Sequence, residues 1–321
     1  MKCVVFRGTG GREVMAIEER PDPVPGRYEV LIAPAFAGLN PADVMQRHGS
    51  HPAPAGWPKD VPGLEVAGTV VAIGEGVSSF AVGDRAFGLV GGGGHATRVL
   101  ALERELLRVP DALDDAHAAA VPEAFLTAYD AIVWQSGLAA GDTLLVNGAS
   151  GGVGTAAVQM ARSLNVNVVA SVRSEGVRER VAALGATALG SEEAFAYVRE
   201  HGGADVILEL VGGINIPDDL ASLASRGTVI IVGSGSGGDP TISMRELMRR
   251  RATIIGTGLR GRPIEQKAAL TQDFGKRVLP LIASGEITPI VDRSFPLEQA
   301  ADAFDALSEP GKFGKLLLQL S

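Results

Sequence analysis

The stretch LLVNGASGGVG, Leu144–Gly154, decides the fold. It runs from an aliphatic segment directly into a cluster of glycines, and the wider segment Thr143–Ala161 carries no charged residue. A membrane span can be equally apolar, but the glycines, together with Asn147, Ser150 and Gln159, would leave polar groups unpaired in lipid. We therefore expect a buried strand, a glycine turn and a helix that packs on a sheet.

The composition is that of an ordinary globular chain. Of its 321 residues, 46% are hydrophobic and 21% charged, and the net charge of −8 argues against a nucleic-acid or anionic-membrane surface. The first residues, MKCVVFRGTGG, reach charge and glycine too early for a secretory signal. Cys3 is the only cysteine, which excludes an intramolecular disulfide and a multi-cysteine zinc site. A cytoplasmic location fits these features best.

The first third of the chain reads as short strands separated by Pro and Gly clusters, the pattern of a small, mainly antiparallel, barrel-like domain. The predicted strands are residues 2–6, 29–37, 66–73, 85–89 and 95–100. The segment HPAPAGWPKDVPG, residues 51–63, contains four prolines and is predicted to be an irregular loop. Long ordered loops often carry function.

From about Pro122 the pattern changes to strands that alternate with helices, which is typical of a parallel sheet covered on both faces. Six strands favour an α/β, Rossmann-type doubly wound fold. They are predicted at residues 143–147, 167–172, 186–189, 205–211, 227–232 and 253–258, with helices at 154–164, 177–184 and 216–224. A helix at 265–283 and a strand at 315–319 close the chain. The predicted domains are 123–260 for the dinucleotide-binding domain, with 1–122 and 261–321 forming the other.

The glycine turn is suited to a pyrophosphate, because a helix N-terminus offers unpaired N–H groups and a partial positive charge. Glycines let a ligand approach closely, since they have no Cβ. The chain offers ASGGVG, residues 149–154, which is a GxGxxG fingerprint with alanine in first place. Its position between a predicted strand and a predicted helix favours dinucleotide binding by Ser150, Gly151, Gly152 and Val153. The alternative is a purely structural turn.

The end of the second predicted strand bears on which dinucleotide binds. Sites that prefer NAD usually have Asp or Glu there for the ribose 2′-hydroxyl. This strand end has Ser171 and Arg173, followed by Arg178. A guanidinium pairs well with a phosphate, so we predict NADPH. The alternative is that both arginines are solvated surface groups.

Several stretches, in this order and spacing, resemble the zinc-independent, zeta-crystallin-like quinone oxidoreductases of the medium-chain dehydrogenase/reductase superfamily. The family's fold has a Rossmann domain beside a GroES-like β-barrel domain. The segments LNPADVMQRHG and AVPEAFLTAYDA look closest to the stress-inducible quinone reductase branch. The matching stretches are AGLNPADVMQRHG (37–49), VPGLEVAGTVVAIGEGVSSFAVGDRAFGL (61–89), AAAVPEAFLTAYDAI (118–132), NGASGGVGTAAVQMAR (147–162) and FPLEQAADAFDAL…GKFGKLLL (295–318).

The resemblance also bears on zinc. Zinc-dependent relatives carry a cysteine ligand and a His–Glu pair where this chain has Asn40, Leu64 and Glu65. A catalytic zinc needs about three protein ligands, so no metal is predicted. Without a Lewis acid, catalysis relies on positioning, which favours acceptors already activated toward hydride, such as quinones or α,β-unsaturated carbonyls.

The resemblance implies a cleft between the two domains in which hydride transfer takes place. Asn40 is expected beside the nicotinamide ribose, Thr127 near the nicotinamide, and Lys315 at the pyrophosphate. Backbone at Gly233 and from Gly256 to Leu259 is expected to line the nicotinamide. The strand Thr253–Gly258 is expected at a sheet edge, and relatives dimerise there, so a homodimer is expected.

Two departures from the family pattern concern the site. Where many relatives have a tyrosine, this chain has His51, which is a possible proton donor. The alternative, which we favour because no orienting partner is visible, is an exposed loop histidine without a catalytic role. Near Gly190, Glu192 and Glu193 replace a tyrosine that contacts the 2′-phosphate in relatives, and carboxylates facing that phosphate would weaken NADPH preference.

The leading expectation is an NADPH-dependent quinone reductase. A second possibility is a reductase of the C=C bond of an enal, enone or enoyl thioester. A third, from another class, is a non-catalytic NADPH-binding or sensor protein, because an intact glycine turn indicates binding and not turnover.

Overall fold

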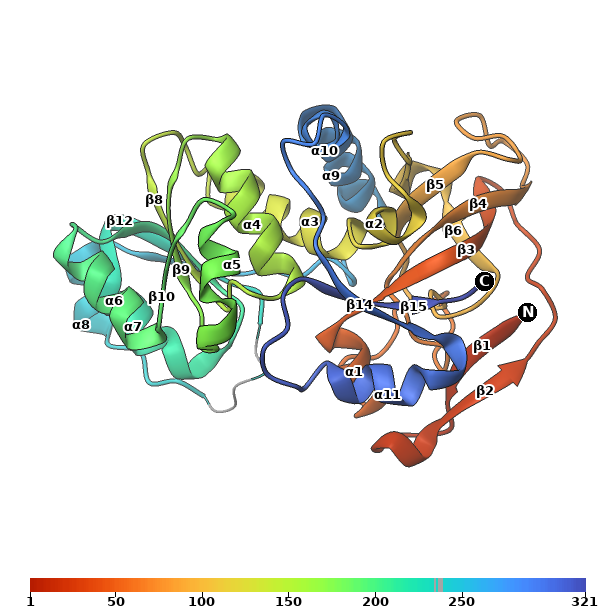
Figure 1. Cartoon of the computed structure of the whole chain (residues 1–321), viewed down its shortest axis with the longest axis horizontal. Coiled ribbons are helices and arrows are strands. Elements are labelled where there is room, and N and C mark those ends of the chain that lie inside the picture. The colour runs from red at the N-terminus through yellow and green to blue at the C-terminus, as the bar shows by residue number, and fades with distance from the viewer. Residues whose placement is uncertain (234, 236–238) are drawn as a thin grey trace. The chain divides into compact units, whose positions relative to one another are not determined.

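The computed structural model describes residues 1–233, 235 and 239–321, which form two compact units (Figure 1). Unit 1 comprises Met1–Leu126, Leu259–Glu309 and Lys315–Ser321. Unit 2 comprises Thr127–Gly258 and Pro310–Gly314. No helix in the described part of the chain is both long and apolar enough to cross a bilayer.

Unit 2 is built on a six-stranded sheet in which every neighbouring pair is parallel, as predicted. The strand order is β10-β9-β8-β11-β12-β13, which is the doubly wound order of dinucleotide-binding domains. β12 begins earlier than expected because a bulge lets Leu223 pair with Ala204. The strands are β8 (Thr143–Asn147), β9 (Asn167–Ser171), β10 (Thr187–Leu189), β11 (Ala204–Glu209), β12 (Leu223–Ile231) and β13 (Thr253–Gly256).

Helices cover both faces of this sheet. Leu145, Val169 and Ile207 share one buried cluster with side chains of α6 and α7. Leu144 and Val146, which point to the opposite face, are equally buried. The helical segments are α3 (Pro122–Tyr129), which begins in unit 1, the π-helical η3 (Asp130–Gln135), α4 (Gly152–Ser163), η4 (Glu175–Val177), α5 (Arg178–Ala182), α6 (Ser191–Glu200), η5 (Gly213–Asn215), α7 (Ile216–Ser222) and α8 (Met244–Arg250).

Unit 1 holds a mixed sheet in which only β14 and β15 pair in parallel. Its order is β14-β15-β3-β4-β5-β7, with β6 also on β3, and β1 and β2 form a separate ribbon. The predicted strand at 95–100 is shifted to 99–102, because Gly93, Gly94 and His95 instead donate to residues 61–63. The strands are β1 (Lys2–Phe6), β2 (Met15–Glu19), β3 (Glu29–Leu39), β4 (Glu65–Ile73), β5 (Arg85–Leu89), β6 (Val99–Leu102), β7 (Leu106–Arg108), β14 (Val291–Pro296) and β15 (Lys315–Gln319).

The predicted helix at 265–283 is divided in two at Val278. Pro280 has no backbone N–H and therefore cannot continue the hydrogen-bond ladder of the first helix. The helical segments of unit 1 are η1 (Arg12–Val14), α1 (Pro41–Arg47), η2 (Glu103–Glu105), α2 (Asp115–Ala119), α9 (Ile264–Arg277), α10 (Leu279–Ala283), η6 (Leu297–Gln299) and α11 (Ala300–Ala306).

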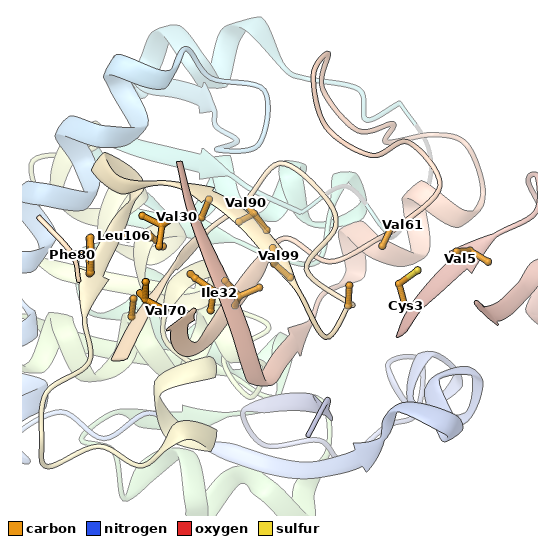
Figure 2. Packing of buried hydrophobic residues seen from close by; sticks show 14 residues of the cluster. Cys3, Val5, Val30, Ile32, Val61, Val70, Phe80, Val90, Val99 and Leu106 are labelled. Carbon is orange, nitrogen blue, oxygen red and sulfur yellow. The ribbon is translucent and has the colours of Figure 1, made fainter. Parts of the chain in front are cut away.

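The core of unit 1 combines many aliphatic side chains with a few phenylalanines. Figure 2 shows side chains of β3, β4 and β6, among them Ile32, Val70 and Val99, in one buried cluster with Cys3 and Leu106. A second cluster joins β3 and β15 to α11. Burial of branched aliphatic side chains of this kind contributes roughly 1.5–3 kcal/mol each, and it fixes the strands that carry the polar residues described below.

Candidate functional site

The glycine turn lies between β8 and α4, as expected. α4 begins at Gly152 with Gly151 as N-cap, and its first turn has neither a side-chain cap nor an acidic residue. A Cβ on Gly154 would lie 2.6 Å from the Cα and C atoms of Ala149, so this glycine is required for the helix to pack against the turn. The first-turn N–H groups therefore suit an anionic ligand, and Ser150, Gly151, Gly152 and Val153 all lie at this end of the helix.

The glycine turn also lies where the strand order reverses. β8 pairs with β9 on one side and with β11 on the other, and ligands of open α/β sheets bind at the carboxyl ends of such strands. Gly233 follows β12, and a Cβ there would lie 2.2 Å from the carbonyl oxygen of Leu210. Gly256 ends β13, where a Cβ would meet nothing within 4 Å. Leu259 is buried and belongs to unit 1.

The three residues expected to select the dinucleotide lie at the end of β9 and in the segment that follows it, up to the start of α5. Ser171 is buried, and its Oγ donates to Ser191 Oγ at 3.1 Å. Arg178 donates from Nε to the carbonyl oxygen of Val172, and its Nη1 lies 3.7 Å from Glu193 Oε2. Arg173 is exposed and has no side-chain hydrogen bond or ion pair within the described part of the chain. Arg173 is therefore the more available cation, and Glu193 is partly neutralised by Arg178.

A second segment lies along the glycine turn, and the sequence pattern did not place it there. The N–H of Gly314 donates to the carbonyl oxygen of Ser150 at 2.9 Å, and Gly314 forms a parallel bridge with Gly151. Arg180 lies over the ring of Phe313, 4.1 Å from its centroid. The sequence signal for this segment was the motif GKFGK, residues 311–315. The motif alone does not indicate that the segment contacts the glycine turn.

In unit 1, Asn40, Glu65 and Lys315 form one buried polar cluster. Lys315 Nζ lies 2.6 Å from Glu65 Oε1, 2.6 Å from Asn40 Oδ1 and 3.1 Å from the carbonyl oxygen of Leu39. Asn40 Nδ2 donates to the same Glu65 oxygen at 2.9 Å, and the N–H of Glu123 donates to the other at 2.7 Å. The Lys315 ammonium thus has three oxygen partners within unit 1, and its expected role at a pyrophosphate stays a prediction.

This cluster does not fit a catalytic zinc. Leu64 has no ligand atom, and the carboxylate of Glu65 is already bound to Lys315. An ammonium between Asn40 and Glu65 occupies the position where a divalent cation would have to sit, and two cations repel at such distances. Across the residues that the structure describes, no three His, Cys, Asp or Glu side chains gather as metal ligands.

His51 lies in the irregular loop and is half-buried rather than exposed. Arg260 fixes the loop, because it donates from Nε to Gly91 O, from Nη1 to His51 O and from Nη2 to Gln46 Oε1. Burial, and then the charge of Arg260, lower the pKa of His51 below its usual value. The imidazole is therefore mainly neutral at neutral pH, which weakens the case for His51 as a proton donor.

Thr127 is buried on α3, and the helix continues into the π-helical η3. π-helical turns are frequent at functional sites. Here Asp130 Oδ2 accepts a hydrogen bond of 2.6 Å from the hydroxyl of Thr257, which lies between Gly256 and Gly258. Asp130 therefore fixes the backbone expected to line a nicotinamide, a role that the sequence did not indicate.

Comparisons with known proteins agree with this arrangement. Residues 26–111 match the alcohol dehydrogenase GroES-like domain, and residues 152–279 match the zinc-binding dehydrogenase family. A quinone oxidoreductase from Sus scrofa is 35% identical over 97% of this chain and 95% of its own. A structure of an NAD-dependent alcohol dehydrogenase is 30% identical with a TM-score of 0.89, covering all of both chains. A mycobacterial protein solved with NADPH is 27% identical with a TM-score of 0.90, over 99% of this chain and all of that one.

A Rossmann sheet with a glycine turn, accompanied by a GroES-like domain, defines an NAD(P)-dependent oxidoreductase of the medium-chain dehydrogenase/reductase type. Within this class, the chain is similar over nearly its whole length to proteins named quinone oxidoreductase. The chain belongs to the quinone oxidoreductase family of that superfamily.

Proposed function

We propose that this protein is a zinc-independent, NADPH-dependent reductase of quinones. The proposed preference for NADPH rests on the residues at the end of β9. The strand does not end in Asp or Glu, and Arg173, two residues beyond it, is exposed. The related structures do not decide this point, since one is named for NAD and another contains NADPH. A free guanidinium at this position favours a 2′-phosphate over a 2′-hydroxyl.

The buried cluster in unit 1 supports the proposed acceptor class. Lys315 holds Glu65 and Asn40 in hydrogen bonds, so the cluster offers no Lewis acid to polarise a weak acceptor. A quinone requires little polarisation, because its carbonyls already accept electrons readily. The relatives named quinone oxidoreductase point to the same class of acceptor.

The residues have distinct proposed roles. The first-turn N–H groups of α4 bind the pyrophosphate, and Arg173 binds the 2′-phosphate. Thr127 and the backbone at Gly233 and Gly256 orient the nicotinamide, which supplies the hydride when the cofactor is bound. Asn40 is proposed as the residue at the nicotinamide ribose, on the strength of the family resemblance alone.

The test is oxidation of NADPH by the purified protein with an ortho-quinone, with a chelator present and with NADH in parallel. Rapid oxidation that favours NADPH and is insensitive to the chelator supports all three parts of the proposal. A preference for NADH would contradict the role of Arg173, and loss of activity with chelator would contradict zinc independence.

Two other functions remain as outcomes of the same assay. Turnover with an enone but not with a quinone would identify a C=C reductase, because both acceptors suit a site without a Lewis acid. Dinucleotide binding without turnover of either acceptor would identify a non-catalytic binding or sensor protein. We also propose a homodimer through β13, which lies at the edge of its sheet as predicted.

A further inference from the structure

Two carboxyl groups are buried together beneath the dinucleotide-binding edge of unit 2, and the proposed function does not use them. Asn147 ends β8, Glu209 ends β11, and the two residues are partners in the parallel register. Asp219 reaches them from α7, and all three side chains are fully buried. Asn147 Nδ2 donates to Glu209 Oε2 at 2.7 Å and to Asp219 Oδ1 at 2.8 Å.

The two carboxyl groups have different surroundings. Glu209 accepts hydrogen bonds from the N–H groups of Val211 and Gly212 and from Asn215 Nδ2, an arrangement that suits an ionised carboxylate. Asp219 accepts only from Asn147, and its Oδ2 has no donor in the described part of the chain. As a carboxylic acid, Asp219 has an O–H that it can donate to the neighbouring Glu209 carboxylate.

Burial, and then the negative charge of Glu209, raise the pKa of Asp219 to about 8. Among the residues that the structure describes, no cation compensates the pair from the elements packed around α7. On α7 itself Asp218 adds negative charge, and on α6 Arg199 is bound to Asp218. On α8, Arg250 donates to backbone carbonyls of residues 221 and 223 and pairs with Glu246.

The carboxyl pair lies next to the two turns that leave the sheet where the strand order reverses. The Glu209 carboxylate fixes the turn after β11 through Val211 and Gly212. This turn packs against the glycine turn, because a Cβ on Gly148 would lie 3.3 Å from Val211 Cγ2 and 3.4 Å from Leu210 Cβ. A second negative charge on Asp219 would repel the Glu209 carboxylate, and any shift of Glu209 would move the turn that it holds against the glycine turn.

We propose that Asp219 is a positioning residue that carries the single proton of this carboxyl pair, and that this proton keeps both turns in their dinucleotide-binding arrangement. The inference rests on the proposed function of the glycine turn. Loss of the proton places two charges in one buried site and opens the turn after β11. Dinucleotide affinity is then lost at alkaline pH without any change in a residue that touches the ligand.

The test is the Kd for NADPH, measured by fluorescence from pH 6.5 to pH 9.5. If only the protonated form binds, the apparent Kd of the wild type rises about tenfold per pH unit above pH 8. Asp219→Asn stays uncharged and keeps an N–H to direct at Glu209, so its Kd is expected to be close to wild type at pH 7 and flat with pH. The matched control is Glu200→Gln on the exposed side of α6, which removes a carboxylate that does not shift the pKa of Asp219 and is expected to retain the wild-type profile.

A wild-type Kd that is flat with pH, or an Asp219→Asn variant that is as pH-sensitive as wild type, would overturn the proposal. So would an Asp219→Asn variant that binds poorly at pH 7, because a carboxylate would then be required. If the variant does not fold, infrared titration of the wild type decides instead. A buried protonated carboxyl at pH 7 that titrates near pH 8 supports the proposal, and its absence refutes it.

Thermal unfolding without ligand separates this inference from the proposed function. Because the pKa of Asp219 is raised in the folded state, the folded protein binds more protons than the unfolded chain between pH 4 and 8. The stability of the wild type relative to Asp219→Asn should therefore fall across roughly that range and level off above it. This measurement requires no dinucleotide, so its result holds even if NADPH does not bind. A stability difference between wild type and Asp219→Asn that stays constant with pH would refute the assignment of the proton to Asp219.

Discussion

Removal of the Lys315 ammonium should destabilise unit 1 strongly, and the structure sets the magnitude. Lys315→Met keeps the length of the side chain but leaves Glu65 fully buried without its ion-pair partner at 2.6 Å. Breaking a buried ion pair from one side typically costs about 3–5 kcal/mol. Glu65 retains donors from Asn40 and Glu123, so we expect the lower end, about 3 kcal/mol. For a unit of this size that is a decrease in Tm of roughly 6–12 °C.

A double-mutant cycle isolates the pair. Glu65→Gln alone leaves the ammonium buried beside neutral oxygens and should cost a similar amount. In the double variant Lys315→Met with Glu65→Gln no charge remains, so most of the loss should be recovered, with a coupling energy of about 2 kcal/mol or more. The control is Lys2→Met, because Lys2 lies 3.7 Å from Glu298 at an exposed site. That change should alter stability by about 0.5 kcal/mol or less.

The assay is urea unfolding of each variant without ligand, followed by circular dichroism, with thermal scans in parallel. A coupling energy below about 0.5 kcal/mol would refute the reasoning, because pairs that interact in a low-dielectric interior do not behave additively. A Lys315→Met variant as stable as wild type would show that Glu65 is not held as a charged group at all.

Further predictions concern the dinucleotide site and the loop. Arg173→Ala should weaken NADPH binding roughly 10- to 100-fold and leave NADH unchanged in parallel titrations, because about 1.5–3 kcal/mol of charge-assisted hydrogen bonding is lost. Gly154→Ala should weaken binding of both dinucleotides, since its Cβ would lie 2.6 Å from Ala149, whereas Gly176→Ala, with nothing within 4 Å of its Cβ, should not. His51→Ala should leave kcat with a quinone near wild type at pH 7.5, where a true general acid would cost about 10²–10⁴-fold. Because the pKa of His51 is lowered, the wild type should lose more stability than His51→Ala as the pH falls below about 6.5.

Local sequence patterns were enough for most of unit 2. Apolar runs followed by glycine or polar turns placed β8 and β9 within one residue, because a strand buried on both faces must be continuously apolar. In unit 1 the local pattern was too weak to predict two strands. β2 carries two glutamates, and β7 has only three residues. Helix α6 (Ser191–Glu200) was not among the helices predicted from the sequence.

The site was harder to predict than the fold, because its polar side chains are defined by distant partners. The sequence placed Lys315 near the cofactor by resemblance, but 250 positions separate it from Glu65, its ion-pair partner. Asp219 follows another aspartate on a short helix, a pattern that usually indicates a solvated surface. Only the packing of α7 on β8 and β11 shows that Asp219 is buried and Asp218 exposed.

Glu65 and Asp219, two of the buried carboxyl groups of this protein, are compensated in different ways, and this difference predicts how each tolerates replacement by an amide. Glu65 is neutralised by a fixed ammonium, so replacing it with glutamine leaves a buried cation without a counter-charge. Asp219 is neutralised by a proton that it holds beside Glu209, so asparagine at 219 preserves the net charge of its cluster. The same carboxylate-to-amide change should therefore destabilise unit 1 at position 65 and be tolerated in unit 2 at position 219. Equal costs at both positions would show that hydrogen-bond geometry, and not buried charge, governs these clusters.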